Sequence, residues 1–208
     1  MKSIFSFTLL FFLFSKSFGQ IDFKGDSVST DNFSRLSFLI DSAYKLDKTY
    51  DFEFRLWTNP SLVTYTNVFI LSQKNKIWTA RFFEYNGNQK QKLSEKTVDQ
   101  SKLDSLWARL TVNQVLTLPS QDSLKNKMKI FVADTSYVLD EEDTYKRLMM
   151  TDGAMYYFEL ATQNKRRSYS YHCPQGYSKL YPNIEELYRA YAIIILVRKY
   201  LGLKLTVC

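Results

Sequence analysis

Side chains that commonly carry out catalysis are scarce in this sequence. His172 is the single histidine of the 208-residue chain, so any Ser-His-Asp or Cys-His arrangement would have to include it. There is no Gly-x-Ser-x-Gly motif, and the six glycines are isolated, so they form no phosphate-binding loop. We therefore expect no nucleophilic catalytic residue and no nucleotide cofactor, and we expect His172 at the solvent edge of a strand.

Paired carboxylates are the one catalytic arrangement that the sequence leaves open, because two acids can meet from distant parts of a fold. Glu53, Glu84 and Glu159 lie in segments predicted to be strands, and this position makes them the candidates. The simpler interpretation is that all three lie on the polar, solvent-exposed face of a sheet. A small carboxylate-dependent hydrolase is therefore the alternative function.

Metal-binding patterns are incomplete. His172, Cys173 and Cys208 would give a zinc ion three ligands, but a fourth is missing and two of the three are adjacent. Residues 140–143 are acidic but lack the glycine and the spacing of a calcium loop. We expect no metal and no other cofactor. The two cysteines are instead predicted to form a Cys173–Cys208 disulfide, because Lys2, the apolar run of residues 4–14 and the small residues Ser17 and Gly19 have the pattern of an export signal.

Tyrosine is concentrated near the end of the chain, where nine of the fifteen tyrosines follow residue 155. Tyr169, Tyr171 and Tyr177, with Arg167 nearby, are candidate contact residues for a protein or a saccharide, because such side chains combine rigid area with polar tips. In the second interpretation, which the sequence favours, these rings fill the seam between the second group of strands and the last helix. Tyr169 and Tyr171 are two residues apart in a predicted strand and therefore share a face.

The first half of the chain is predicted to contain one helix and one strand meander. Cap residues and a regular apolar face indicate a helix over residues 30–48. Residues 50–56 alternate between apolar and charged side chains, which is the pattern of a strand with one solvent-exposed face. The other predicted strands are rich in β-branched and aromatic residues or follow a turn, and they lie at residues 62–72, 76–85 and 89–93.

The middle of the chain begins with a second predicted helix. Thr97 and Gln100 have the spacing of a capping box, and apolar residues at helical spacing follow. Residues 111–145 show no clear pattern, although a short element is expected around residues 130–138 because such a long loop is uncommon in a compact domain.

A second meander and a last helix end the predicted fold. The strands are expected at residues 147–150, 155–162 and 167–172, with Pro174 ending the last one. The last helix has Asn183 as its expected N-cap and Gly202 just beyond its end. Its most apolar part contains Ile194 and Ile195, which we expect in the core.

This order of elements, with grouped strands and helices between the groups, indicates an α+β fold. We expect an antiparallel sheet built from two β-meanders, with about three helices packed mainly on one face. No linker or low-complexity segment interrupts the chain, so residues 20–208 are predicted to form a single domain.

The first nineteen residues have the features of a secretory signal peptide. Lys2 gives a positive start, residues 4–14 are an apolar run, and Ser17 and Gly19 are small residues at the expected cleavage site before Gln20. The apolar run is shorter than the about 20 residues that a membrane span needs. We therefore expect an exported protein, periplasmic or secreted, with no membrane span after cleavage.

The charge pattern argues against a nucleic-acid partner. The chain has 28 Lys and Arg residues against 21 Asp and Glu residues, for a formal net charge of +7. The basic residues are scattered among acids and form no stripe with interleaved aromatic residues.

Several short segments resemble those of small uncharacterised exported proteins of Bacteroidota. They are the end of the leader, residues 103–107 (LDSLW), residues 116–119 (LTLP), residues 157–160 (YFEL) and the closing helix. The resemblance implies export and carries no assigned activity. Together with the lack of a catalytic constellation, it favours a non-enzymatic binding or structural module of the cell envelope, with an unknown protein or saccharide partner.

The leader predicts that the exported protein begins at Gln20. Its intact mass, measured by mass spectrometry, should match residues 20–208, less one ammonia if Gln20 cyclises. Exported protein that still carried Met1 to Gly19 would contradict this prediction.

Overall fold

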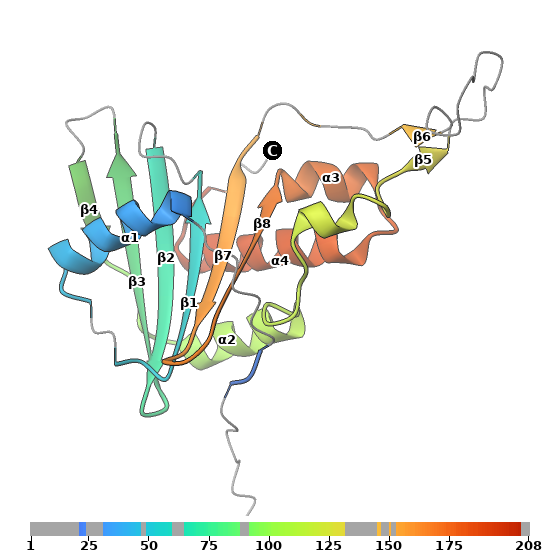
Figure 1. The fold of residues 1–208 in the computed structure, drawn as a ribbon. Helices are drawn as coiled ribbons and strands as arrows, with labels where there is room; N and C mark the ends of the chain where they lie inside the picture. The colour runs from blue at the N-terminus through green and yellow to red at the C-terminus, as the bar shows by residue number, and fades with distance from the viewer. Residues whose placement is uncertain are drawn as a thin grey trace, which may run out of the picture.

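A six-stranded antiparallel sheet forms the centre of the protein, with the strand order β4-β3-β2-β1-β7-β8 (Figure 1). The computed structural model describes residues 21–23, 31–46, 49–59, 65–87, 92–131, 145–146, 150 and 153–204. The strands of this sheet are β1 (Phe52–Thr58), β2 (Tyr65–Lys74), β3 (Ile77–Asn86), β4 (Lys92–Lys96), β7 (Met155–Ala161) and β8 (Arg166–His172). The helices are α1 (Asp31–Ala43), α2 (Leu103–Val112), α3 (Pro174–Leu180), α4 (Glu185–Tyr200) and the short 3-10 helix η1 (Gln121–Leu124).

Strand β1 joins the two groups of strands that the sequence predicts. It pairs with β2 on one side, where Arg55 is opposite Ile70, and with β7 on the other side, where Arg55 is opposite Glu159. The first meander therefore continues directly into the second one, and the predicted α+β fold with an antiparallel sheet is confirmed.

One face of the sheet carries the main core. Phe54, Leu71 and Phe158 point to this face and are buried against the helices behind the sheet. Helix α2 contributes Leu103, Leu106 and Leu110, which are spaced for one helical face. Helix α4 crosses behind the sheet (Figure 1) and contributes its buried apolar side chains, which are Leu187, Ala190, Ile193, Ile194, Leu196 and Val197.

The opposite face is covered in part by α1, which crosses β1, β2 and β3 (Figure 1). Ile40 of the helix packs there against a second cluster that includes Trp57, Val68 and Phe83. The expectation of a solvent-exposed face on β1 was therefore wrong, because six of its seven residues are buried. The alternating pattern is present, but a helix from the start of the chain covers the face that carries the charges.

Helix α2 begins without the predicted capping box. Its N-cap is Lys102, in the left-handed conformation and without a side-chain cap bond, so Thr97 does not cap it. Gln100 instead pairs with β3: its Oε1 accepts from the Ala80 amide at 2.9 Å, and its Nε2 donates to the Ala80 carbonyl at 2.8 Å. Thr97 and Gln100 have the spacing of a capping box, but the side chain of Gln100 bonds the backbone of β3 instead of the helix.

Helix α4 confirms one predicted end and corrects the other. Gly202 lies just beyond the helix at a φ of 66°, where its amide bonds the Lys199 carbonyl at 3.2 Å. At the start, Ile184 is the N-cap in place of Asn183, and no side chain caps the helix. Buried Ile184 joins the core, and this apolar contact sets where the helix begins.

Other elements differ from the prediction in extent. The first helix ends at Ala43, before the predicted end at residue 48. Helix α3 was not predicted, because Pro174 was interpreted only as the end of a strand. Proline is also favoured in the first turn of a helix, and this is where Pro174 lies. Within residues 130–138, the structure describes the short strand β5 (Ile130–Phe131), which pairs with β6 (Tyr145–Lys146). The strand predicted at residues 147–150 lies outside the described residues apart from Met150, which is not in a strand.

The two isoleucines at the centre of α4 differ in burial. Ile194 is fully buried, as predicted, whereas Ile195 is only half-buried, so its placement in the core was wrong. Ile194→Ala is therefore expected to lower the free energy of unfolding by about 2–4 kcal/mol, through lost burial and the cavity that remains. Ile195→Ala is the matched control and should cost clearly less. Urea denaturation followed by circular dichroism measures both, and equal costs would contradict the packing described here.

Candidate functional site

The tyrosines predicted as contact residues lie in the core. Tyr169 is 4% exposed, Tyr171 0% and Tyr177 6%. The Tyr169 hydroxyl donates to the Val115 carbonyl at 2.6 Å, and the Tyr171 hydroxyl donates to the Pro119 carbonyl at 2.7 Å. Tyr169 and Tyr171 therefore fill a seam between β8 and the segment that follows α2, whereas Tyr177 lies on α3 and its hydroxyl accepts from the Met150 amide at 3.0 Å.

Arg167 strengthens the same seam. Its guanidinium donates to the Leu116 and Leu118 carbonyls, each at 2.5 Å, and lies 4.9 Å from the centre of the Tyr169 ring. Burial raises the pKa of Tyr169 and of Tyr171 above the ordinary phenol value, so both keep their protons and donate. A role for Arg167 and the three tyrosines in contacting a partner remains a prediction, and their burial does not support it.

The residues considered for metal or disulfide chemistry lie at the end of β8. His172 is partly exposed, and its backbone amide donates to the Gln121 side chain at 2.7 Å. Cys173 is fully buried, while Cys208 lies outside the described residues, so their disulfide remains a prediction. In the described parts of the chain, no group of three His, Cys, Asp or Glu side chains is arranged to hold a metal ion.

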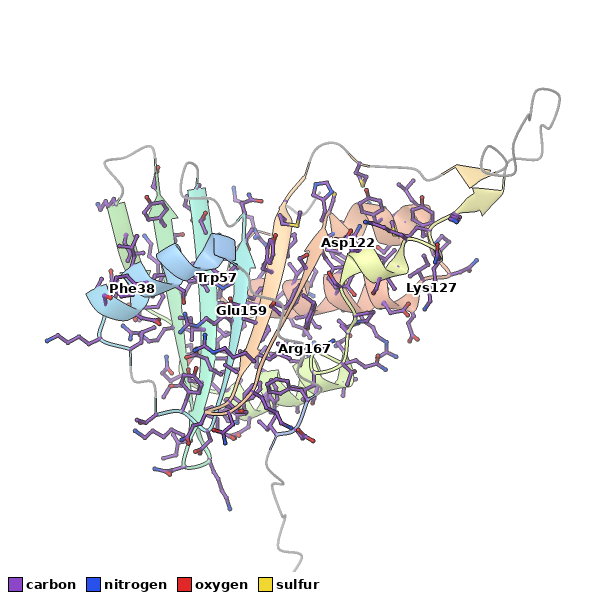
Figure 2. The ribbon with its side chains drawn as sticks, in the orientation of Figure 1. Phe38, Trp57, Asp122, Lys127, Glu159 and Arg167 are labelled. Atoms are coloured by element: carbon purple, nitrogen blue, oxygen red, sulfur yellow. The ribbon has the colours of Figure 1, made fainter. Side chains whose placement is uncertain are left out.

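Two of the three candidate carboxylates meet around Arg55, on the face of the sheet that α1 covers. The guanidinium of Arg55 donates to Glu53 at 2.7 Å and to Asp41 of α1 at 3.0 Å. The Glu159 carboxylate accepts from the Trp57 indole at 2.7 Å, and Figure 2 shows these two side chains side by side. Arg55 and Glu159 are direct cross-strand neighbours.

This network is a buried cluster in which the cation of Arg55 bonds the carboxylates of both Glu53 and Asp41. Glu53 is 4% exposed and Arg55 8%, so the expectation of an exposed polar face was wrong for Glu53. Burial alone would lower the pKa of Arg55, but the carboxylates of Glu53 and Asp41 raise it, and Arg55 stays charged. Burial also raises the pKa of Glu159 above its ordinary range.

The third candidate carboxylate is far from the other two in the sheet. Glu84 of β3 accepts from the Tyr65 hydroxyl at 2.6 Å and pairs with Lys96 at 3.2 Å. None of the three glutamates lines the open groove at the end of the sheet that is next to α2. Their arrangement does not place two carboxylates on either side of a substrate, which glycoside hydrolysis requires.

An open groove of about 1340 Å³ lies at the end of the sheet where the β2–β3 and β7–β8 turns meet α2. In Figure 1 this is the lower end of the sheet, next to α2. The short segment Ile21 and Asp22 forms one wall, and the Asp22 carboxylate pairs with Lys165 at 2.7 Å. The hydrogen bond from Lys165 lowers the pKa of Asp22, so the Asp22 carboxylate stays ionised at neutral pH.

Three aromatic rings form the floor of the groove. The centre of the Trp107 ring lies 4.9 Å from Phe52 and 4.9 Å from Trp78, which are 6.2 Å from each other. Phe52 and Trp78 are buried, whereas Trp107 is partly exposed. The two buried rings hold Trp107 in place, so its exposed surface is rigid.

The rim of the groove is polar, and its residues come from two turns and one helix. Gln73 and Lys76 lie at the β2–β3 turn, Gln163 and Asn164 at the β7–β8 turn, and Asp104 on α2. Sequence reasoning missed this site, because Trp107 has the spacing of a core residue and the rim residues are far apart in the chain. Only the fold brings them together.

Comparisons with known proteins give no assignment for this chain. It matches no model of a known protein family and no curated protein sequence. None of the helices in the described part of the chain is long and apolar enough to cross a membrane.

The network around Arg55 predicts a large stability effect. Arg55→Met would leave the buried Glu53 carboxylate without its counter-charge, and is expected to cost about 3–5 kcal/mol of unfolding free energy. Adding Glu53→Gln should recover a large part of that loss. Lys125→Met is the control, since Lys125 pairs with Asp122 on the surface and should cost no more than about 0.5 kcal/mol. Denaturant unfolding measures these variants, Glu53→Gln alone and the wild type, and losses of the two single variants that simply add in the double variant would contradict a buried pair.

Proposed function

We propose that this protein is an exported, non-enzymatic binding module of the cell envelope, and that it holds its ligand in the groove over Trp107. The observation that carries the proposal is the groove itself, where an exposed aromatic surface lies inside a polar rim. The leader sequence supports export, and the resemblance to exported proteins of Bacteroidota supports a place in the envelope.

The groove has the physical features of a binding site. Ligand sites in proteins are concave and combine aromatic surface with a few polar groups that orient the ligand. Trp107 is braced by Phe52 and Trp78, so binding would not have to order a mobile ring. The polar groups on the rim come from the turns at the end of the sheet and from α2.

The alternative, a small carboxylate-dependent hydrolase, has weaker support. Glu53 and Glu159 surround a buried arginine, and Glu84 is paired with Lys96 on another strand. Glu53 is bonded by Arg55 and Glu159 accepts from the Trp57 indole, and neither carboxylate lines the groove over Trp107 where a substrate could meet it. Product analysis in the experiment below tests this alternative directly.

Tryptophan fluorescence offers a test of the groove. Two of the three tryptophans, Trp78 and Trp107, line it, while Trp57 is fully buried on the opposite face. We expect that at least one of the glycan, peptide and lipid fractions of a Bacteroidota envelope extract changes the emission of the purified mature protein. We also expect the added material to be recovered unchanged.

A pair of variants on α2 makes this test specific. Ala108→Arg should fill the groove and weaken the response about tenfold or more, since Ala108 is exposed and lines it. Ser105→Arg adds the same side chain to an exposed position of the same helix outside the groove, and should respond like the wild type. No response to any fraction, or equal responses of the two variants, would overturn the proposal. Cleaved products would favour the hydrolase.

A further inference from the structure

We infer that the ligand of the groove is an uncharged oligosaccharide. This inference rests on the proposed function and names the chemical class of what the groove holds. Three properties of the groove carry it: the shape of its aromatic floor, the chemistry of its rim and its balance of charge.

The floor offers one aromatic ring with exposed surface, which a ligand can contact. Trp107 is partly exposed, while Phe52 and Trp78 pack against it and are buried. The face of an aromatic ring carries negative potential and attracts groups with partial positive charge. The C–H groups on one side of a sugar ring are such groups, and they lie in a plane that matches an indole.

The rim supplies hydrogen-bonding groups of both kinds. Gln73, Gln163 and Asn164 have side-chain amides, each with donors and an acceptor. The hydroxyls of Thr111 and Thr162 also line the groove, where Thr111 donates to the Ala108 carbonyl and Thr162 accepts from the Lys165 amide. Every sugar hydroxyl is also both donor and acceptor. Gln163 and Asn164 are exposed at the tip of the β7–β8 turn, where they can meet hydroxyls on a ring that is stacked on the floor.

The charges around the groove nearly cancel. Asp22 and Lys165 pair with each other, and Asp51 accepts from the Asn75 amide at 2.7 Å. Lys76 and Asp104 add one charge of each sign. Sites for phosphate or carboxylate ligands bring several cationic groups together, and this groove does not. An uncharged ligand fits it better than a polyanion.

Size and position argue against the other ligand classes. A volume of about 1340 Å³ exceeds the roughly 300–1,000 Å³ of a site for a small molecule, so several sugar units fit. An extended peptide is commonly bound by pairing with a sheet edge. The edge strands here are β4 and β8, and the groove is lined instead by strand ends, turns and α2. The polar rim is equally unsuited to an acyl chain.

The test uses defined oligosaccharides and fluorescence of the purified mature protein. The neutral probes are maltohexaose, cellohexaose, mannohexaose and N-acetylchitohexaose, and the anionic probe is hexagalacturonate. At least one neutral hexasaccharide should bind, and should bind more tightly than its own monosaccharide. Gln163→Ala combined with Asn164→Ala should weaken that binding about fivefold or more, which is roughly 1 kcal/mol. Asn126→Ala, which removes an exposed amide outside the groove, should bind like the wild type.

The outcomes separate this inference from the proposed function. Binding only of hexagalacturonate would overturn the uncharged ligand, and a groove response only to the peptide or lipid fraction of the extract would overturn the saccharide. Either outcome would leave a binding module. Equal binding by the Gln163→Ala, Asn164→Ala double variant and by the Asn126→Ala control would also overturn the assignment of the ligand. Thermal unfolding confirms that each variant is folded before its binding is measured. Failure of every probe and every fraction would overturn both proposals.

Discussion

The ion pair between Arg55 and Glu53 is the interaction on which the arrangement of the sheet most depends. It lies on β1, the strand that joins the two meanders, and both faces of that strand are buried. A charge in such a place is tolerated only when it is paired and hydrogen-bonded. Arg55 meets this condition by also bonding Asp41 and Ser37 of α1. The need to pair one buried cation therefore ties the first helix to the centre of the sheet.

The opposite face depends on a second set of polar contacts. Tyr169, Tyr171 and Arg167 of β8 donate to successive carbonyls of the segment that follows α2. That segment has no regular secondary structure, so its backbone groups need partners from elsewhere. Gln100 does the same at the start of α2, by pairing with Ala80 of β3. Helix α2 is thus held at both ends, and one wall of the groove is fixed with it.

The charge network around Arg55 and the groove over Trp107 therefore have different roles. The charges under α1 satisfy one another, and they stabilise the sheet. The groove at the end of the sheet has polar groups of several kinds around a ring surface that is partly exposed. Groups that are already paired in a core do not have to meet a ligand, whereas exposed side chains on turns at the end of the sheet, such as those of Gln163 and Asn164, can reach one. This contrast is why the groove, and not the charge network, is the basis of the proposed function.

Local patterns in the sequence determined the elements that depend on neighbours in the chain. The alternation over residues 50–56 predicted β1, and the isolated glycine at 202 predicted the end of α4. The grouping of strands and helices predicted the α+β class. The leader and its cleavage site likewise depend only on adjacent residues, and their interpretation remains a prediction.

Tertiary structure decided everything that depends on which elements meet. Whether Glu53 faces solvent or a buried arginine depends on whether α1 covers that face of β1. The alternation of apolar and charged residues over 50–56 is the same in both cases. Ile194 and Ile195 are equally apolar, and only the packing of α4 buries the first and leaves the second half-exposed. Trp107 and Asn164 share the groove although they are far apart in the chain. Propensity acts over a few residues, whereas burial, ion pairing and cavities are properties of contacts between distant segments, which no local pattern encodes.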